Sequence, residues 1–167
     1  KSAGRIVLPG VGAFSDAVKK LRNSGLDKLV MSEAAGGKPL LGICLGMQML
    51  FEKSYEYGEY EGLGLIDGNV KPLYGAISEK LKIPHIGWNA LHFPKEKNKL
   101  FKYVEENECV YFVHSYYGAD CNSVIATAEY GKEITAAVAE KNVYGCQFHP
   151  EKSGKTGLNI LKGFMEV

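Results

Sequence analysis

One short motif constrains the fold of this chain more than any other feature. Residues 42–46 read Gly-Ile-Cys-Leu-Gly, and they separate an apolar run at residues 39–43 from a second one at residues 45–51. The first run is typical of a buried strand, and the second of a helix. Glycines on both sides of the central residue permit a turn that is too tight for side chains. The pattern therefore predicts a strand–turn–helix unit that raises Cys44 above a sheet.

The same alternation of strand and helix precedes this motif. Residues 5–8 form an apolar run that ends at Pro9 and Gly10, which predicts a buried strand entering a turn. We expect Ser15 to be the N-cap of a first helix, and residues 26–35 to form a second helix. Strands and helices that alternate over short connections favour a mainly parallel sheet.

The second half of the chain is richer in strands. Four runs separated by turn residues predict them: residues 110–113, 124–128, 135–139 and 143–148. The chain closes with a predicted helix over residues 154–166, in which Leu158, Leu161 and Met165 share a face. We expect residues 55–64, rich in Tyr, Glu and Gly, to be a solvated loop.

Composition narrows the possible partners. The 167 residues include 20 Lys and Arg against 19 Asp and Glu, a net charge of +1 that argues against binding nucleic acid or an anionic membrane. No apolar run approaches the ~18 residues of a membrane span, and residues 1–5 resemble no signal peptide, so we expect a cytoplasmic protein. The four cysteines are scattered, which argues against a structural zinc site, any other metal site or a disulfide framework.

Cys44 is the best candidate nucleophile. At the start of a helix its thiol would meet backbone N–H groups and the positive end of the helix dipole, which lower a thiol pKa. The N–H of Leu45 would then be placed to donate to an oxyanion. The alternative is a buried, inert cysteine in a tight turn, which is the usual state of an unpaired Cys.

Residues 147–151, Gln-Phe-His-Pro-Glu, supply a candidate base. Residues two apart on an extended backbone point the same way, so His149 and Glu151 can face one site, and Pro150 restricts His149 to an extended conformation. A carboxylate behind an imidazole fixes its tautomer, as in a Cys-His-Glu triad. The alternative is a histidine that ends an edge strand, with a solvated Glu in a turn.

A glycine loop follows the first predicted strand. Gly10 and Gly12 flank Val11, and such a loop lets backbone N–H groups approach a ligand closely. The spacing opens like a dinucleotide fingerprint, but Ser15 stands where the third glycine belongs, so we expect no cofactor. The other interpretation is an oxyanion loop opposite Cys44.

Together these segments resemble the triad-type (class I) glutamine amidotransferases, and within them the glutaminase subunits of imidazole glycerol phosphate synthase. The motifs that carry the resemblance run in the family's order along the chain: residues 8–14, 42–48, 85–89, 112–117 and 149–153. The resemblance implies a flavodoxin-like open, mainly parallel sheet with helices on both faces, joined to an antiparallel, β-rich C-terminal half.

The resemblance also implies a role for each matching residue. Cys44 attacks the side-chain amide of glutamine, His149 transfers the proton, and Glu151 orients His149. The N–H groups of Val11 and Leu45 would form the oxyanion hole. Further positions match those that hold glutamine: Gly10, Gly12, Gly46, Gln48, His114, Ser115 and Tyr116.

Such a glutaminase delivers ammonia to a (β/α)₈-barrel cyclase in histidine biosynthesis, so the resemblance implies a heterodimer. Trp88, Tyr111 and Lys152 would lie on the face that meets the cyclase. From its residue type alone, Trp88 fits either an interface anchor or core filling. Family members open with a strand and helix that have no counterpart before Arg5, so we expect residues 1–167 to form a single amidotransferase domain without them.

Two other functions fit the same motifs. One keeps the triad but changes the substrate, giving a γ-glutamyl hydrolase or a Cys peptidase of the same fold. The other is a non-catalytic, amidotransferase-like module that binds a partner.

Overall fold

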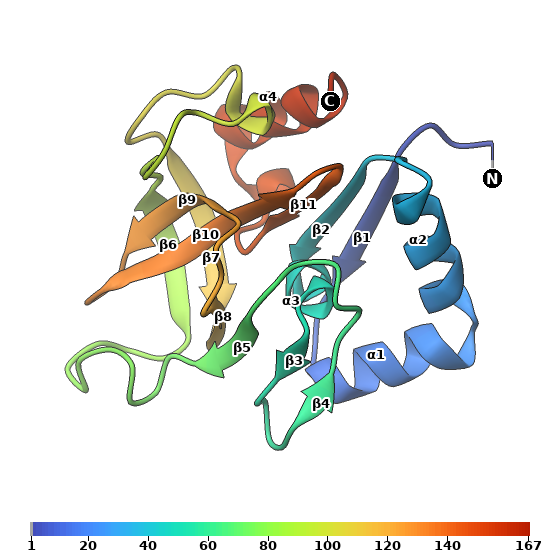
Figure 1. Cartoon of the computed structure of the whole chain (residues 1–167). Coiled ribbons are helices and arrows are strands. Elements are labelled where there is room, and N and C mark those ends of the chain that lie inside the picture. Colours follow the sequence, from blue (N-terminus) through green and yellow to red (C-terminus); the bar gives the residue numbers. More distant parts are fainter. Residues whose placement is uncertain (1) are drawn as a thin grey trace.

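A computed structural model describes residues 2–167, in which a five-stranded sheet forms the centre of the molecule (Figure 1). Its strands run in the order β1 (Ile6–Gly10), β2 (Leu40–Cys44), β11 (Val143–Cys146), β10 (Glu133–Glu140) and β9 (Val124–Glu129). β2 pairs in parallel with both β1 and β11, whereas β10 pairs antiparallel with β11 and β9. The sheet thus joins a parallel half to an antiparallel half, as the sequence predicts.

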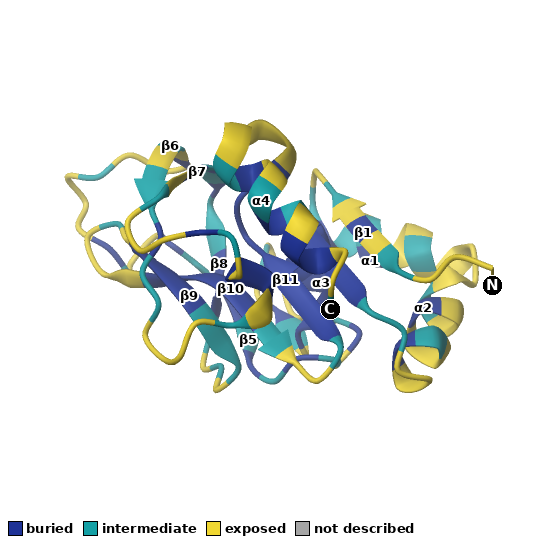
Figure 2. Ribbon diagram, turned by 90° about the horizontal axis from the view of Figure 1, so that it is seen from above, coloured by how far each residue is buried: buried dark blue, intermediate teal, exposed yellow. Residues whose placement is uncertain are grey.

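Helices cover both faces of this sheet (Figure 2). On β2, Leu40 packs in one core cluster with residues of α1 (Phe14–Asn23), α2 (Leu26–Ala35) and α3 (Leu45–Leu50). The next residue, Leu41, belongs to the opposite cluster, with residues of α4 (Gly154–Phe164). Successive strand side chains point to opposite faces, so a run of apolar residues is what a strand buried on both faces requires.

Two smaller sheets complete the fold, built from strands of the middle of the chain and of its second half. One contains β4 (Tyr60–Glu61), β3 (Lys53–Ser54), β5 (Asn69–Pro72) and β8 (Tyr116–Ala119), in that order. The other pairs β6 (His85–Ala90) with β7 (Cys109–His114). There are also two short 3₁₀ helices, η1 (Lys99–Phe101) and η2 (Pro150–Lys152). Both contact α4, and η2 also contacts β7. The predicted fold class is confirmed.

The C-terminal helix packs differently from the sequence prediction. Leu158 and Met165, expected on the buried face, are 66% and 63% exposed. The buried face of α4 carries Gly157, Ile160, Gly163 and Phe164 instead. A Cβ at Gly157 would stand 1.8 Å from the Pro150 carbonyl oxygen, and one at Gly163 would stand 2.2 Å from that of Leu100. The helix therefore buries its glycine face because only that face permits so close an approach.

The N-cap prediction for the first helix is wrong. Helix α1 begins at Phe14, and its N-cap is Ala13, not Ser15. The N–H of Phe14 donates instead to the carboxylate of Glu56, at 2.5 Å. Residues 55–64 are mostly exposed, as expected of a solvated loop, but they also include β4 and residues that line the candidate site.

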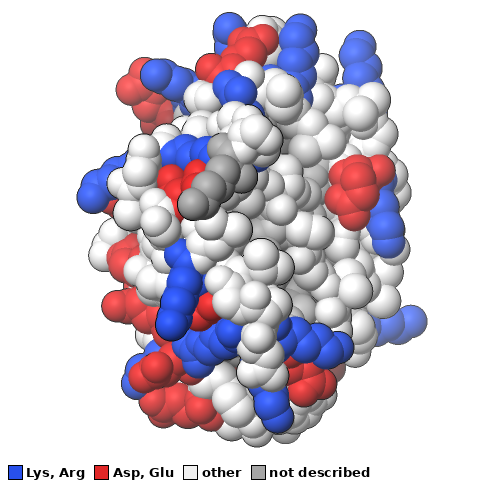
Figure 3. All heavy atoms as spheres, turned by 90° about the vertical axis from the view of Figure 1, so that its right-hand side faces the viewer, with Lys and Arg blue, Asp and Glu red and all other residues white. Residues whose placement is uncertain are grey.

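The surface is of mixed charge. On the face over α1 and α2, basic and acidic side chains are interspersed, with an uncharged area beside them (Figure 3). None of the helices within residues 2–167 is long and apolar enough to cross a membrane.

Candidate active site

The turn at residues 42–46 has the geometry that its glycines predict. Cys44 ends β2, precedes α3, and has a φ of 55°, a conformation that is costly for a residue with a side chain. A Cβ on Gly42 would stand 2.7 Å from the Gly46 carbonyl oxygen, and one on Gly46 would stand 1.7 Å from that of Leu8. Only glycine fits either position, so the sequence forces the strained turn that presents Cys44.

The glycine loop lies directly beside this turn. Gly10 is the parallel-register partner of Cys44, and a Cβ on Gly10 would stand 3.0 Å from the Gly46 nitrogen. Val11, which follows, is 81% exposed and lines the same cavity as Cys44, together with Gly12. Gly10 and Gly46 are not among the residues that line this cavity, and both pack closely against neighbouring backbone.

The Cys44 sulfur is buried among polar groups. Its Sγ lies 4.0 Å from the Val113 carbonyl oxygen and 3.9 Å from Nε2 of Gln147, which donates to it. Burial raises the pKa of the Cys44 thiol to about 11, and the nearby backbone N–H of Leu45 opposes this rise only in part. The pKa is thus raised where the sequence predicts a lowering, because desolvation outweighs the hydrogen bond from the Leu45 N–H.

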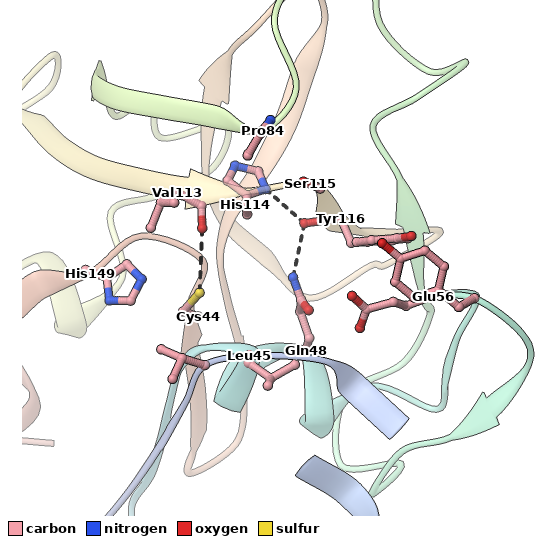
Figure 4. Close-up of a pocket in the computed structure, with 13 residues that line it drawn as sticks. Cys44, Leu45, Gln48, Glu56, Pro84, Val113, His114, Ser115, Tyr116 and His149 are labelled. Atoms are coloured by element: carbon pink, nitrogen blue, oxygen red, sulfur yellow. Dashed lines mark hydrogen bonds between the residues drawn. The ribbon is translucent and has the colours of Figure 1, made fainter. Parts of the chain in front are cut away.

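His149 and Glu151 lie as the spacing predicts. Nδ1 of His149 is 2.7 Å from Oε1 of Glu151, which fixes the tautomer and the ring orientation. Nε2 of His149 is buried and has no hydrogen-bond partner among the described residues. The imidazole and the Cys44 sulfur face the same cavity, with one ring nitrogen directed toward Cys44 (Figure 4). An unpaired buried nitrogen is costly unless a reacting group uses it.

The backbone of His149 is held by β7. Its N–H donates to the Tyr111 carbonyl at 2.9 Å, and its own carbonyl accepts from Oγ of Ser153 at 2.6 Å. The same Ser153 oxygen accepts from the Tyr111 N–H at 2.9 Å. These bonds explain how a residue 105 positions from Cys44 in the sequence reaches the same site.

A cavity of about 330 Å³ opens at Cys44 and His149. Its lining includes most of the residues expected at the site: Val11, Gly12, Leu45, Gln48, His114, Ser115 and Tyr116. Sequence reasoning missed four further lining residues: Glu56, Tyr57, Pro84 and Val113. Of these, Glu56 alone carries a carboxyl group, and it stands at the side of the cavity away from His149 (Figure 4).

Two of the expected binding residues use their polar atoms within the protein. Both ring nitrogens of His114 are engaged, Nδ1 with the Tyr116 carbonyl at 2.8 Å and Nε2 with His85 at 3.0 Å. The amide nitrogen of Gln48 donates to the same carbonyl and to Gln147 Oε1, each at 3.1 Å. The His114 ring and the Gln48 amide nitrogen therefore shape the cavity and leave the Gln48 oxygen for a ligand.

The residues expected at a partner interface form a surface group. Trp88 and Tyr111 are cross-strand neighbours on β6 and β7, with ring centroids 6.1 Å apart. Trp88 is 58% exposed, which excludes core filling. Lys152, also exposed, belongs to η2, which packs on β7.

All four cysteines are free thiols. Among residues 2–167, no cluster of three or more His, Cys, Asp and Glu side chains is arranged to hold a metal ion.

Comparisons with known proteins agree on one family. The family model for class I glutamine amidotransferases matches residues 1–167. The chain is 47% identical to "Imidazole glycerol phosphate synthase subunit HisH" of Oceanobacillus iheyensis, covering 100% of this chain and 82% of that one. It is 49% identical to the protein of the same name from Listeria monocytogenes, covering 99% and 78%. A solved structure titled "Structure of PurLQS from Thermotoga maritima" has a TM-score of 0.70 at 21% identity, covering 98% of this chain and 79% of that one, a likeness of fold.

Proposed function

Because this chain belongs to the class I glutamine amidotransferases, we propose that Cys44, His149 and Glu151 are its glutamine-hydrolysing triad. The chain is a glutaminase of histidine biosynthesis, a subunit of imidazole glycerol phosphate synthase, like the relatives to which it is nearly half identical. The name of those relatives implies a second subunit.

The reaction begins with the transfer of the Cys44 proton to Nε2 of His149 as the sulfur attacks the amide carbon of glutamine. The oxyanion that forms is held by the N–H of Leu45 and by the N–H of Val11. His149 then returns the proton to the leaving nitrogen, ammonia departs, and a γ-glutamyl thioester remains on Cys44. Water attacks the thioester with His149 as base, which releases glutamate and restores the thiol.

The strongest support for the triad is Nε2 of His149, which is buried in the cavity that Cys44 also lines and has no hydrogen-bond partner among the residues that the structure describes. Glu151 occupies the other ring nitrogen, so Nε2 is the acceptor in the neutral ring, as a base for the thiol requires. The Glu151 side chain is 50% exposed. Exposure is compatible with its role, because Glu151 orients the His149 ring and does not itself transfer a proton.

The resting thiol is not preactivated. A pKa of about 11 keeps Cys44 protonated at neutral pH, so the proton must leave as the substrate is attacked. The Val11 side chain is also 81% exposed, so it does not anchor the glycine loop in the core. Low activity of the chain alone, and stimulation by its partner, follow from these two features.

We assign recognition of the amino-acid end of glutamine to the part of the cavity away from His149. There the Glu56 carboxylate lines the wall together with Tyr116 (Figure 4). Tyr57, which also lines the cavity, has its ring 6.2 Å from that of Tyr116. A carboxylate in a half-enclosed site pairs well with an α-ammonium group. Glu56 also accepts from the Phe14 N–H, which fixes the carboxylate in place.

The second subunit would be a (β/α)₈-barrel cyclase that consumes the ammonia, bound over Trp88, Tyr111 and Lys152. The support is the exposed aromatic pair on β6 and β7, since exposed Trp and Tyr side chains are typical interface anchors. Mixed surface charge and four free thiols support a cytoplasmic protein that binds neither nucleic acid nor membrane.

The test is glutamate release from glutamine by the chain assembled with its cyclase. We expect Cys44→Ala to abolish release, and Cys109→Ala, at an exposed free thiol, to leave it unchanged. Turnover that survives in Cys44→Ala would refute the triad. Equal turnover with and without the cyclase would favour a stand-alone γ-glutamyl hydrolase or peptidase instead.

A further inference from the structure

Two buried histidines form a pair behind one wall of the cavity. His85, the first residue of β6, lies opposite His114, the last residue of β7, and their Nδ1 and Nε2 atoms are 3.0 Å apart. Both residues are at most 5% exposed. His85 does not line the cavity, and the triad uses neither ring.

The proton positions on the two rings follow from one carbonyl. The Tyr116 carbonyl oxygen can only accept, so Nδ1 of His114, 2.8 Å away, must carry the hydrogen. In a neutral ring Nε2 of His114 is then an acceptor, so Nδ1 of His85 must be the donor. Nε2 of His85 is left as an acceptor, and it lies 3.4 Å from the amide nitrogen of Asn89, a donor. Each bond thus allows one tautomer at each ring.

The surroundings keep this pair neutral. Burial lowers the pKa of both His85 and His114 to about 4. The His85 ring stacks on Tyr130 and Phe112, at centroid distances of 4.0 and 4.8 Å. A second proton on His114 would place its Nε2–H against the Nδ1–H of His85. A second proton on His85 would place its Nε2–H against the amide NH₂ of Asn89.

The pair acts on a part of the chain that a substrate would touch. Ser115 and Tyr116 follow His114 directly and line the cavity. The Tyr116 carbonyl accepts from His114 on one side and from Gln48 on the other (Figure 4). Without the hydrogen bond from His85, the buried Nε2 of His114 loses its donor and the ring is held on one side only. The bond from Nδ1 of His114 to the Tyr116 carbonyl is then less firmly fixed, and with it this wall of the cavity.

We propose that His85 is a positioning residue for glutamine binding, which acts through His114 to fix the wall formed by Ser115 and Tyr116. The proposal rests on the proposed function, because that function assigns glutamine to this cavity. Cys44 and His149 make no contact with His85, so the chemical step should survive its replacement.

Two substitutions separate the hydrogen bond from the packing. His85→Phe keeps an aromatic ring between Tyr130 and Phe112 but removes both nitrogens. His85→Asn keeps a donor in place of Nδ1. Assayed as glutaminase in the complex with the cyclase, His85→Phe should raise the KM for glutamine about tenfold, equivalent to ~1.4 kcal/mol, with kcat within about twofold. His85→Asn should stay within about threefold of the wild-type KM.

The matched control is His92→Phe, the same change at a histidine that pairs with Glu106 on the surface. It should leave KM unchanged. An unchanged KM in His85→Phe would overturn the proposal. So would an equal rise of KM in the Phe and Asn variants, or a fall in kcat alone, because a lost positioning bond predicts none of these.

A second measurement needs neither a variant nor turnover. Ring ¹⁵N chemical shifts of the unmodified protein should show His85 and His114 neutral and protonated on Nδ1 between about pH 5.5 and 7.5. A ring protonated on Nε2, or one that titrates near its usual pKa, would overturn the proposal even if His85→Phe fails to fold. Absence of glutaminase activity in the wild-type complex would instead refute the proposed function, and the spectrum would still decide the pairing.

Discussion

Nδ1 of His149 lies 2.7 Å from the carboxylate of Glu151, while Nε2 of the same ring is buried and has no partner within residues 2–167. The carboxylate therefore dictates which nitrogen faces Cys44. In Glu151→Gln the amide can donate to Nδ1 and favour the wrong tautomer. We expect glutaminase kcat of the complex to fall about 100-fold with little change in KM.

The chain offers a matched control for this change. Glu106 also contacts a histidine, His92, at 3.3 Å, but on the surface. Glu106→Gln should leave kcat unchanged. Loss of activity in both variants, or in neither, would contradict the role given to Glu151.

The turn that presents Cys44 depends on the absence of side chains. Gly46→Ala places a Cβ 1.7 Å from the Leu8 carbonyl oxygen, which forces β1 and α3 apart. We expect the free energy of unfolding to fall by about 3 kcal/mol, measured by urea denaturation. Gly36→Ala, with a φ of −75° and the nearest contact at 3.4 Å, should change it by less than about 1 kcal/mol. Similar losses in both would show that the turn is not the cause.

The strand–turn–helix unit was predictable because its determinants are local. Glycines at residues 42 and 46, and the spacing of His149 and Glu151, act over a few residues and leave a readable pattern. Glu56 was not predictable, since its partner Phe14 lies 42 residues away and residues 55–64 have no apolar pattern. The pairing of His85 with His114 depends on the register of β6 and β7, which no short motif encodes.

The buried face of α4 could not be predicted from the sequence either, because packing decides it. Leu158, Leu161 and Met165 have helical spacing, and so do Gly157, Ile160 and Phe164. The spacing alone cannot choose between them. The choice is made by close contacts of Gly157 and Gly163 with distant carbonyl oxygens.

Stability should depend on pH through the buried histidine pair. The pKa values of His85 and His114 fall from 6.5 in an unfolded chain to about 4 in the fold. Between these values the unfolded chain binds protons that the folded chain does not. The contribution of the two histidines to the free energy of unfolding is therefore greatest above pH 6.5 and is lost as the pH falls toward 4.

The groups that face the pair are Asn89, Tyr130, Phe112 and, on the side of the active site, His149. Urea denaturation of the wild type should show a steeper fall between pH 6.5 and 4.5 than denaturation of His85→Phe. Parallel curves for the two proteins would contradict the neutral pair.

The proposed partner face can be tested by removing its exposed aromatic anchor. Trp88→Ala should weaken binding of the cyclase about 30-fold, measured by calorimetry. Tyr60→Ala, on β4 and away from β6 in Figure 1, removes another exposed aromatic ring and should leave the affinity unchanged. Unchanged affinity in Trp88→Ala would move the interface elsewhere.

The most direct test of the account is to trap the covalent intermediate. The complex is mixed with glutamine, quenched in acid during turnover, digested and analysed by mass spectrometry. We expect a glutamyl group on the peptide that contains Cys44, none on the peptide that contains the exposed Cys109, and no adduct in Cys44→Ala. Glutamate release without a trapped adduct on Cys44, or an adduct on another cysteine, would contradict it.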